Sequence, residues 1–120
     1  MNSCNFIGRL VNTPKLEVLD NEEKTKVSNF TIAVYSDGRV KGSGESAYFY
    51  DCKAWGKQAE FLVENFVQGE HIGVSGKLRY DEYQTKEKKK YRKYYIYVRQ
   101  LSFCENKHTG KEEEEEKEGE

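Results

Sequence analysis

Aromatic and basic residues share one face of a short central stretch, and their spacing suits contact with unpaired bases. Phe49, Lys53 and Trp55 are separated by even numbers of residues, so in a β-strand all three side chains point the same way. An aromatic ring can stack on any base, and a lysine can neutralise a phosphate without fixed geometry. The pattern therefore predicts a surface that contacts single-stranded nucleic acid with little regard to sequence.

A second predicted strand, at residues 71–83, carries the same combination of rings and cations. Lys77, Arg79 and Tyr83 point to one of its faces. Asp51 shares the face of Lys53 and should repel phosphate unless it caps a neighbouring basic group. Other segments provide further contact candidates: Lys57 after the central stretch, Arg9, Tyr35 at the end of a strand, and Lys86 and Lys88 in a basic hairpin tip at residues 84–90. A glycine-rich loop at residues 36–46 contains Arg39 and Lys41 and could close over a bound strand.

The periodicity of apolar residues predicts the elements that must hold these side chains. Runs of β-forming residues predict strands at residues 3–11, 15–19, 26–35, 48–55, 71–83 and 91–103. After Gly56, an apolar stripe at helical spacing predicts one helix, which Gly69 should end. The stripe consists of Ala59, Leu62, Val63 and Phe66. The expected strand residues of the core are Phe30, Ile32, Val34, Cys52, Ala54, Ile96 and Val98. The pattern predicts a small β barrel with one helix.

Length and composition limit the classes of protein to which the chain can belong. A chain of 120 residues suffices for one domain with a modest core. No apolar run approaches the length of a membrane span, and residues 1–6 do not resemble a signal peptide, so we expect a cytoplasmic protein. Cys4, Cys52 and Cys104 are widely spaced and odd in number, which predicts reduced thiols packed in the β core. His71 and His108 provide no paired zinc ligands, and we expect no metal or cofactor.

Charge divides the chain into two parts. Residues 105–120 hold eight Glu and three Lys, a net charge of -5, and contain no large apolar residue. Residues 1–104 hold 17 Lys and Arg against 13 Asp and Glu, a net charge of +4. We therefore expect a folded, mildly basic domain at residues 1–104 and a disordered acidic tail at residues 105–120. A basic body favours a polyanionic partner.

The central block, residues 49–60 (Phe-Tyr-Asp-Cys-Lys-Ala-Trp-Gly-Lys-Gln-Ala-Glu), resembles the centre of the bacterial and phage single-stranded DNA-binding proteins. Other blocks are similar in order and spacing, at residues 2–10, 13–17, 27–34 and 74–79. The resemblance covers about residues 1–103. It implies an all-β fold with one helix, the OB-fold, which is a five-stranded, partly open Greek-key barrel. It also implies a non-enzymatic protein that binds and protects single-stranded DNA during replication, recombination and repair.

The resemblance assigns some roles residue by residue. The stacking aromatics of the family fall on Phe49, Trp55 and Tyr83. A further stacking aromatic of some members falls on Gly38, so that role does not carry over, and Tyr35 is only a substitute three residues earlier. Family members usually form homotetramers in which first strands pair, as residues 3–11 could do, although a dimer is also compatible with the sequence. Tyr50 falls where family members place an interface residue.

Three other functions are compatible with parts of the sequence. An OB-fold module for RNA or tRNA would use the same rings, because stacking does not distinguish ribose from deoxyribose. A small OB-fold nuclease would need clustered carboxylates, whereas Asp51, Asp81 and Glu82 are scattered among lysines. An adaptor that acts only through its acidic tail would leave the aromatic and basic face unexplained.

The tail generates a first prediction. Tethering gives the run Glu112–Glu116 a high effective concentration at the basic face, where it can act as a weak phosphate mimic that salt screens. Deleting residues 106–120 should leave the fold intact and tighten binding to oligo(dT) at low salt, with a gain that shrinks as salt rises. Equal affinity of the full and truncated proteins at every salt concentration would show that the tail does not compete.

Bacterial family members usually end in an acidic tip with a terminal phenylalanine that docks on replication or repair proteins. Residues 118–120 are Glu-Gly-Glu and depart from that pattern. The sequence therefore keeps the acidic character of such a tail but does not support docking of repair partners by that route.

Overall fold

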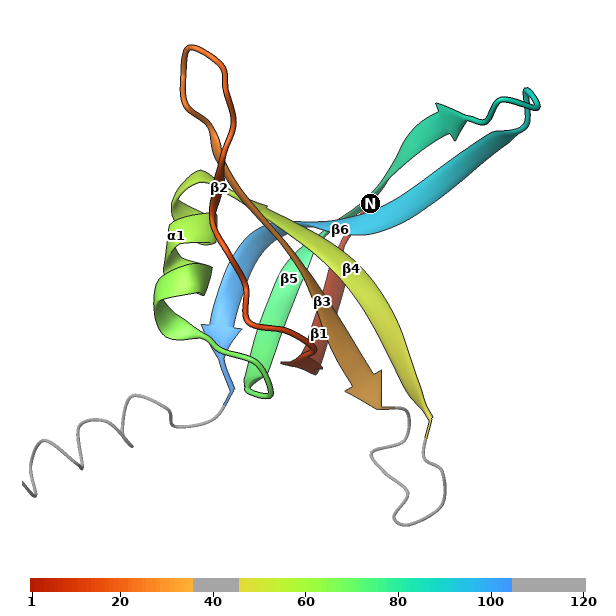
Figure 1. The fold of residues 1–120 in the computed structure, drawn as a ribbon. Helices are drawn as coiled ribbons and strands as arrows, with labels where there is room; N and C mark the ends of the chain where they lie inside the picture. The colour runs from red at the N-terminus through yellow and green to blue at the C-terminus, as the bar shows by residue number, and fades with distance from the viewer. Residues whose placement is uncertain (36–45, 105–120) are drawn as a thin grey trace, which may run out of the picture.

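The computed structural model describes residues 1–35 and 46–104 (Figure 1). The expectations for Arg39, Lys41 and the acidic tail lie outside these residues. The described elements follow the predicted order: β1 (Cys4–Leu10), β2 (Glu17–Val18), β3 (Lys26–Tyr35), β4 (Ala47–Trp55), α1 (Gly56–Asn65), β5 (His71–Gln84) and β6 (Lys90–Phe103). No helix in these ranges is long and apolar enough to cross a membrane.

Five of the strands form a closed ring. They pair in the order β1-β5-β6-β4-β3, and β1 then pairs with β3 through Arg9 and Leu10. The parallel contact between β4 and β6 is short and joins Cys52 to Ile96 and Lys53 to Tyr97. A five-stranded barrel with such narrow closures is the OB-fold, so the predicted fold class is confirmed. The expected core residues Phe30, Ile32, Cys52, Ala54, Ile96 and Val98 are buried, and Val34 packs against them.

Helix α1 lies against one end of the barrel (Figure 1). It ends at Asn65, so the prediction that Gly69 ends it is wrong. The reason is Phe66, which leaves the helix in an extended conformation and buries its ring against Phe61 and Phe103, at centroid distances of 6.0 and 5.0 Å. Gly69 instead has a positive φ of 89° in the turn before β5.

The three cysteines differ in their surroundings. Cys52 is buried, and burial raises the pKa of its thiol to about 12, so the thiol stays protonated at neutral pH. Cys4 is half-buried, and Cys104 is exposed just after the last residue of β6. The prediction of three thiols packed in the core therefore holds for Cys52 and is wrong for Cys104.

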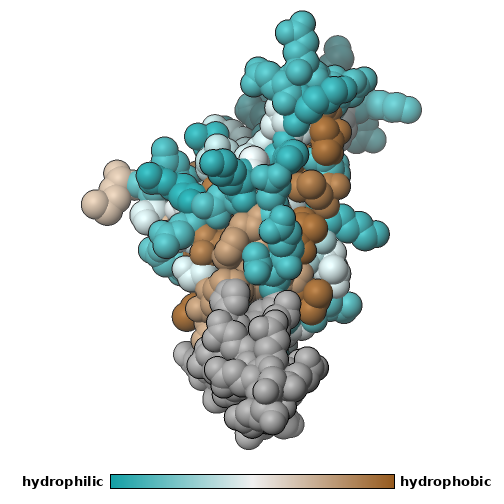
Figure 2. Space-filling model, turned by 90° about the vertical axis from the view of Figure 1, so that its left-hand side faces the viewer, coloured by the Kyte–Doolittle hydropathy of each residue, from teal (hydrophilic) through white to brown (hydrophobic). Residues whose placement is uncertain are grey.

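Strands β5 and β6 continue beyond the barrel as a two-stranded ribbon, which we call the arm (Figure 1). We define the arm as residues 77–97, including its base at Ile96 and Tyr97, where β6 still pairs with β4. The arm begins at a β-bulge between Ser75 and Gly76. A Cβ at Gly76 would lie 2.1 Å from the carbonyl oxygen of Tyr97, so no side chain fits there. Figure 2 shows that hydrophilic side chains cover the upper end of the molecule, where the arm tip and the turn before β3 lie in Figure 1.

The close approach at Gly76 generates a second prediction. Gly76→Ala should destabilise the fold by about 1–3 kcal/mol, because the added methyl meets backbone that cannot rotate away. Urea unfolding followed by Trp55 fluorescence measures the change. Gly73→Ala is the matched control in the same strand, since its methyl would make ordinary contacts of 3.4 Å with Cys104 and Ser102. Equal midpoints for the two variants would contradict the prediction.

Candidate nucleic-acid interface

Strand register gathers the predicted contact residues onto one outward face. Asn29 of β3 pairs with Lys53 of β4, Lys53 pairs with Tyr97 of β6, and Tyr97 pairs with Lys77 of β5. Paired residues point to the same side of a sheet, so this row crosses four strands. The face continues along the arm through the pairs Arg79–Tyr95, Asp81–Lys93 and Tyr83–Tyr91. We call the outward side of β3, β4 and these arm residues the front face.

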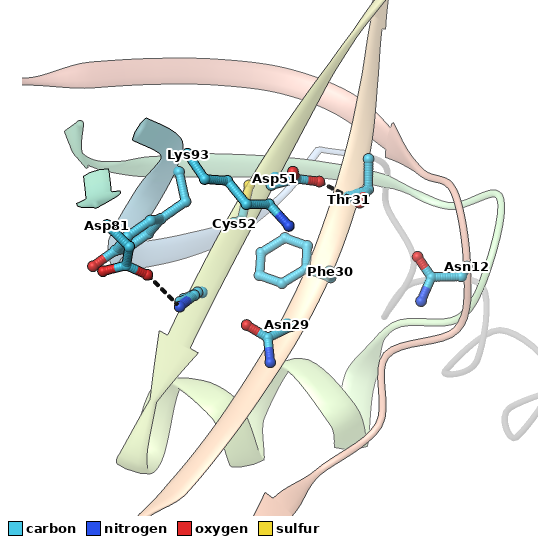
Figure 3. A pocket seen from close by; sticks show the side chains of 10 residues that line it. Asn12, Asn29, Phe30, Thr31, Asp51, Cys52, Asp81 and Lys93 are labelled. Atoms are coloured by element: carbon cyan, nitrogen blue, oxygen red, sulfur yellow. Dashed lines mark hydrogen bonds and ion pairs between the residues drawn. The ribbon is translucent and has the colours of Figure 1, made fainter. Parts of the chain in front are cut away.

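A hollow of about 360 Å³ lies in the front face. Figure 3 shows side chains reaching it from separate parts of the chain: Asn12 from the loop after β1, Asn29 and Thr31 from β3, Asp51 from β4, and Asp81 and Lys93 from the arm. Its lining therefore combines amides, a hydroxyl, carboxylates and cations. OB-folds bind oligonucleotides over this region of the barrel, between the first loop and the last hairpin.

Two of the predicted cations rest on tyrosine rings of the same face. Lys53 Nζ lies 4.5 Å from the Tyr95 ring centroid, and Arg79 Cζ lies 4.3 Å from that of Tyr97. Such contacts contribute about 0.5–1 kcal/mol when exposed. Lys53 Nζ also lies 3.3 Å from Asp81 Oδ2 in a partly exposed ion pair of small net strength. The contacts fix both cations on the front face without neutralising Arg79.

The three predicted stacking aromatics differ in exposure. Phe49 is 64% exposed opposite the buried Ala33. Tyr83 is 53% exposed and stacks on Tyr91, with ring centroids 5.6 Å apart. Trp55 is half-buried at the end of β4, and its Nε1 is buried without a hydrogen-bond partner in the described residues. A buried donor is usually paired, so this indole N–H is an uncommon feature.

The remaining predicted residues differ in exposure and contacts. Lys57 is the exposed second residue of α1, Lys77 is half-buried, and Lys86 and Lys88 are exposed in the turn at the arm tip. Arg9 donates a hydrogen bond from Nη1 to the Gly69 carbonyl at 2.7 Å. Arg9 and Tyr35 line a separate small hollow beside His71.

Of the two alternatives for Asp51, the structure does not show the capping of a basic group: Asp51 makes no ion pair within residues 1–35 and 46–104. Its Oδ1 accepts a hydrogen bond from the Thr31 hydroxyl at 2.9 Å, because the two residues are paired across β3 and β4. Asp51 and Asp81 line the same hollow, so carboxylates that look scattered in the sequence share a site. The structure shows no cluster of three or more His, Cys, Asp or Glu side chains suited to a metal ion within residues 1–35 and 46–104.

Four front-face residues of β6 are absent from the predicted set: Tyr91, Lys93, Tyr95 and Tyr97. Their alternation carries the same signal that singles out the central strand. The density of tyrosines in this segment is typical of strand packing, which hides that signal until the register is known.

The amino-acid sequence was also compared with known protein families. Residues 1–104 match the model of the single-strand binding protein family. The chain belongs to this family.

Several relatives are similar over most of the chain. A protein named single-stranded DNA-binding protein 2 from Clostridium acetobutylicum is 39% identical over 88 residues, which is 72% of this chain and 64% of the relative. A single-stranded DNA-binding protein from Fusobacterium nucleatum is 34% identical over 110 residues, which is 89% of this chain and 69% of the relative. The match covers less than two thirds of the first relative's length.

The position of Lys57 generates a third prediction. In the described chain, α1 has no acidic residue in its first turn and no side-chain cap, and Lys57 places a positive charge against the positive end of the helix dipole. Lys57→Glu should stabilise the fold by about 0.3–1 kcal/mol at low ionic strength. The same change should weaken binding to oligo(dT), because the predicted phosphate contact of Lys57 would become a repulsion.

Thermal unfolding and an oligo(dT) titration of the same sample measure both effects. Lys57→Gln removes the charge without adding a carboxylate and should give a smaller change of the same sign in each. A Lys57→Glu protein that binds as tightly as the unchanged protein would remove Lys57 from the interface.

Proposed function

We propose that this protein binds single-stranded DNA without sequence preference across the front face. The observation that supports this most is the row of rings and cations that the strand register gathers from β4, β5 and β6. Rings accept any base, and cations accept any phosphate, so the combination suits a single strand of arbitrary sequence. Family membership and the names of the relatives support DNA as the ligand.

Each group has a distinct part in the proposed mechanism. Bases stack on Phe49, Trp55 and Tyr83, which lie at separate points of the front face. Phosphates contact Lys53, Lys57, Lys77, Arg79, Lys86 and Lys88. A phosphate at Lys53 replaces Asp81 as its counter-ion, and this exchange costs little because the pair is partly exposed.

The proposal extends to the biological role. Residues 1–104 form the DNA-binding domain, residues 105–120 form an acidic tail, and the protein coats exposed single strands in the cytoplasm during replication, recombination and repair. It acts as a homo-oligomer rather than as an enzyme. The exposed edge of the barrel at β1 supports this assembly, because β1 pairs with β3 only through Arg9 and Leu10.

A fluorescence titration tests the proposal directly. Trp55 is the only tryptophan, so its emission reports on one position. Poly(dT) should quench it strongly, and Trp55→Ala should weaken binding by about 1–3 kcal/mol, the usual contribution of one stacked base. The logarithm of the binding constant should also fall linearly with the logarithm of the salt concentration, with a slope of about -0.7 for each neutralised phosphate.

Competing nucleic acids provide the controls. Duplex DNA of equal length should compete poorly, because its bases cannot reach the rings. A matched RNA oligomer separates DNA binding from the RNA-binding alternative. Unchanged Trp55 emission at saturating DNA would exclude stacking at Trp55, and equal competition by duplex would overturn the proposed function as a whole.

A further inference from the structure

The arm carries a second set of exposed rings that the proposed mechanism leaves unused. We call it the reverse face and define it as Leu78, Tyr80, Glu82, Arg92 and Tyr94. Tyr80 pairs with Tyr94 and Glu82 pairs with Arg92, so these side chains point away from the front face. Leu78, Tyr80 and Tyr94 are 45%, 47% and 49% exposed. A two-stranded ribbon with both faces exposed is marginally stable unless something covers it.

The reverse face repeats the arrangement of the front face. The rings of Tyr80 and Tyr94 lie 5.3 Å apart, and Arg92 Cζ lies 4.9 Å from the Tyr80 centroid. Each face of the arm thus presents tyrosines with a cation lying on a ring.

The charge of the arm indicates what covers it. Residues 77–97 hold eight Lys and Arg against three Asp and Glu, a net charge of +5. The turn between the strands is held by backbone hydrogen bonds between Thr85 and Lys89 and between Lys88 and Thr85. Lys86 and Lys88 lie in this turn, at the tip of the arm, where the front face and the reverse face meet. Cations at the tip and rings on both sides suit one polyanion that passes around the arm.

Resting on the proposed function, we propose that the reverse face is a second stacking surface for the same bound DNA strand. Bases stack on Tyr80 and Tyr94, and phosphates contact Arg92 and Lys90. The arm then lies between two segments of one strand, and its basic tip contacts the phosphates where the strand turns. The reverse face is engaged only by DNA long enough to reach both sides.

Oligomers of two lengths test this proposal on the full-length protein. A double variant, Tyr80→Ser with Tyr94→Ser, should bind oligo(dT) of about 8 nucleotides normally, since that length fits the front face alone. Its affinity for oligo(dT) of about 32 nucleotides should fall, by roughly fivefold to a hundredfold for each base that no longer stacks. The number of nucleotides occupied per protein on poly(dT) should also fall.

Two further variants serve as controls. Tyr83→Ser with Tyr91→Ser removes the front-face pair on the same arm and should weaken binding at both lengths. Tyr48→Ser removes a 55% exposed tyrosine of β4 outside the arm and should change neither affinity. Normal quenching of Trp55 by the short oligomer shows that the proposed function holds, whatever the reverse face does.

Three results would overturn the proposal. The first is unchanged affinity of the Tyr80→Ser, Tyr94→Ser variant for the long oligomer, and the second is an equal loss of affinity for both oligomers. The third is a changed mass of the variant's assembly by light scattering, which would make the reverse face a protein contact. If the double variant does not fold, photo-crosslinking of the unaltered protein to 5-iododeoxyuridine oligomers decides the question. Long oligomers should crosslink to Tyr80 or Tyr94, and their absence from the crosslinked peptides would equally overturn it.

Discussion

The contact between the backbones of β5 and β6 at Gly76 determines where the interface lies. Gly76 approaches the Tyr97 carbonyl so closely that only a hydrogen fits, and the bulge at Ser75 and Gly76 changes the register at the same point. Just beyond this point β6 still closes the barrel through Ile96 and Tyr97, which pair with β4, and the two strands then leave the barrel as the free part of the arm. Tyr97 also pairs with Lys53, so the same residue joins the arm to β4. A shift of one residue here would reverse the faces of every arm side chain.

The rings and cations of the interface hold one another before any ligand binds. Lys53 lies on Tyr95, Arg79 on Tyr97, and Tyr83 on Tyr91. Long cationic side chains lose rotamer freedom when they are fixed, and here much of that cost falls on folding rather than on the proposed DNA binding. The contacts are weak enough for a phosphate to compete with them. The arrangement favours a binding surface that is preorganised and a contact that is reversible.

The sequence predicts single faces well and contacts between distant segments poorly. Alternation along β4 correctly assigns Cys52 and Ala54 to the core and Phe49 to the outside, because period-two geometry is local. The end of α1 is missed because the burial of Phe66 is a tertiary event. The Asp51–Thr31 and Lys53–Asp81 contacts depend on strand pairing, which one sequence does not specify. The Greek-key barrel topology follows from the family resemblance, whereas periodicity predicts only a small β barrel with one helix.

The junction of β4 and α1 combines three locally unfavourable features in three residues. Trp55 occupies the N-cap position without a side-chain hydrogen bond to the helix, its own Nε1 is buried without a partner in the described chain, and Lys57 opposes the helix dipole. A serine or aspartate cap and an acidic first turn would suit the helix better. Sequences otherwise consistent with their folds break local rules mainly at functional sites. The mismatch between Trp55, Lys57 and the needs of α1 thus supports, independently of exposure, the view that this junction is shaped by ligand binding.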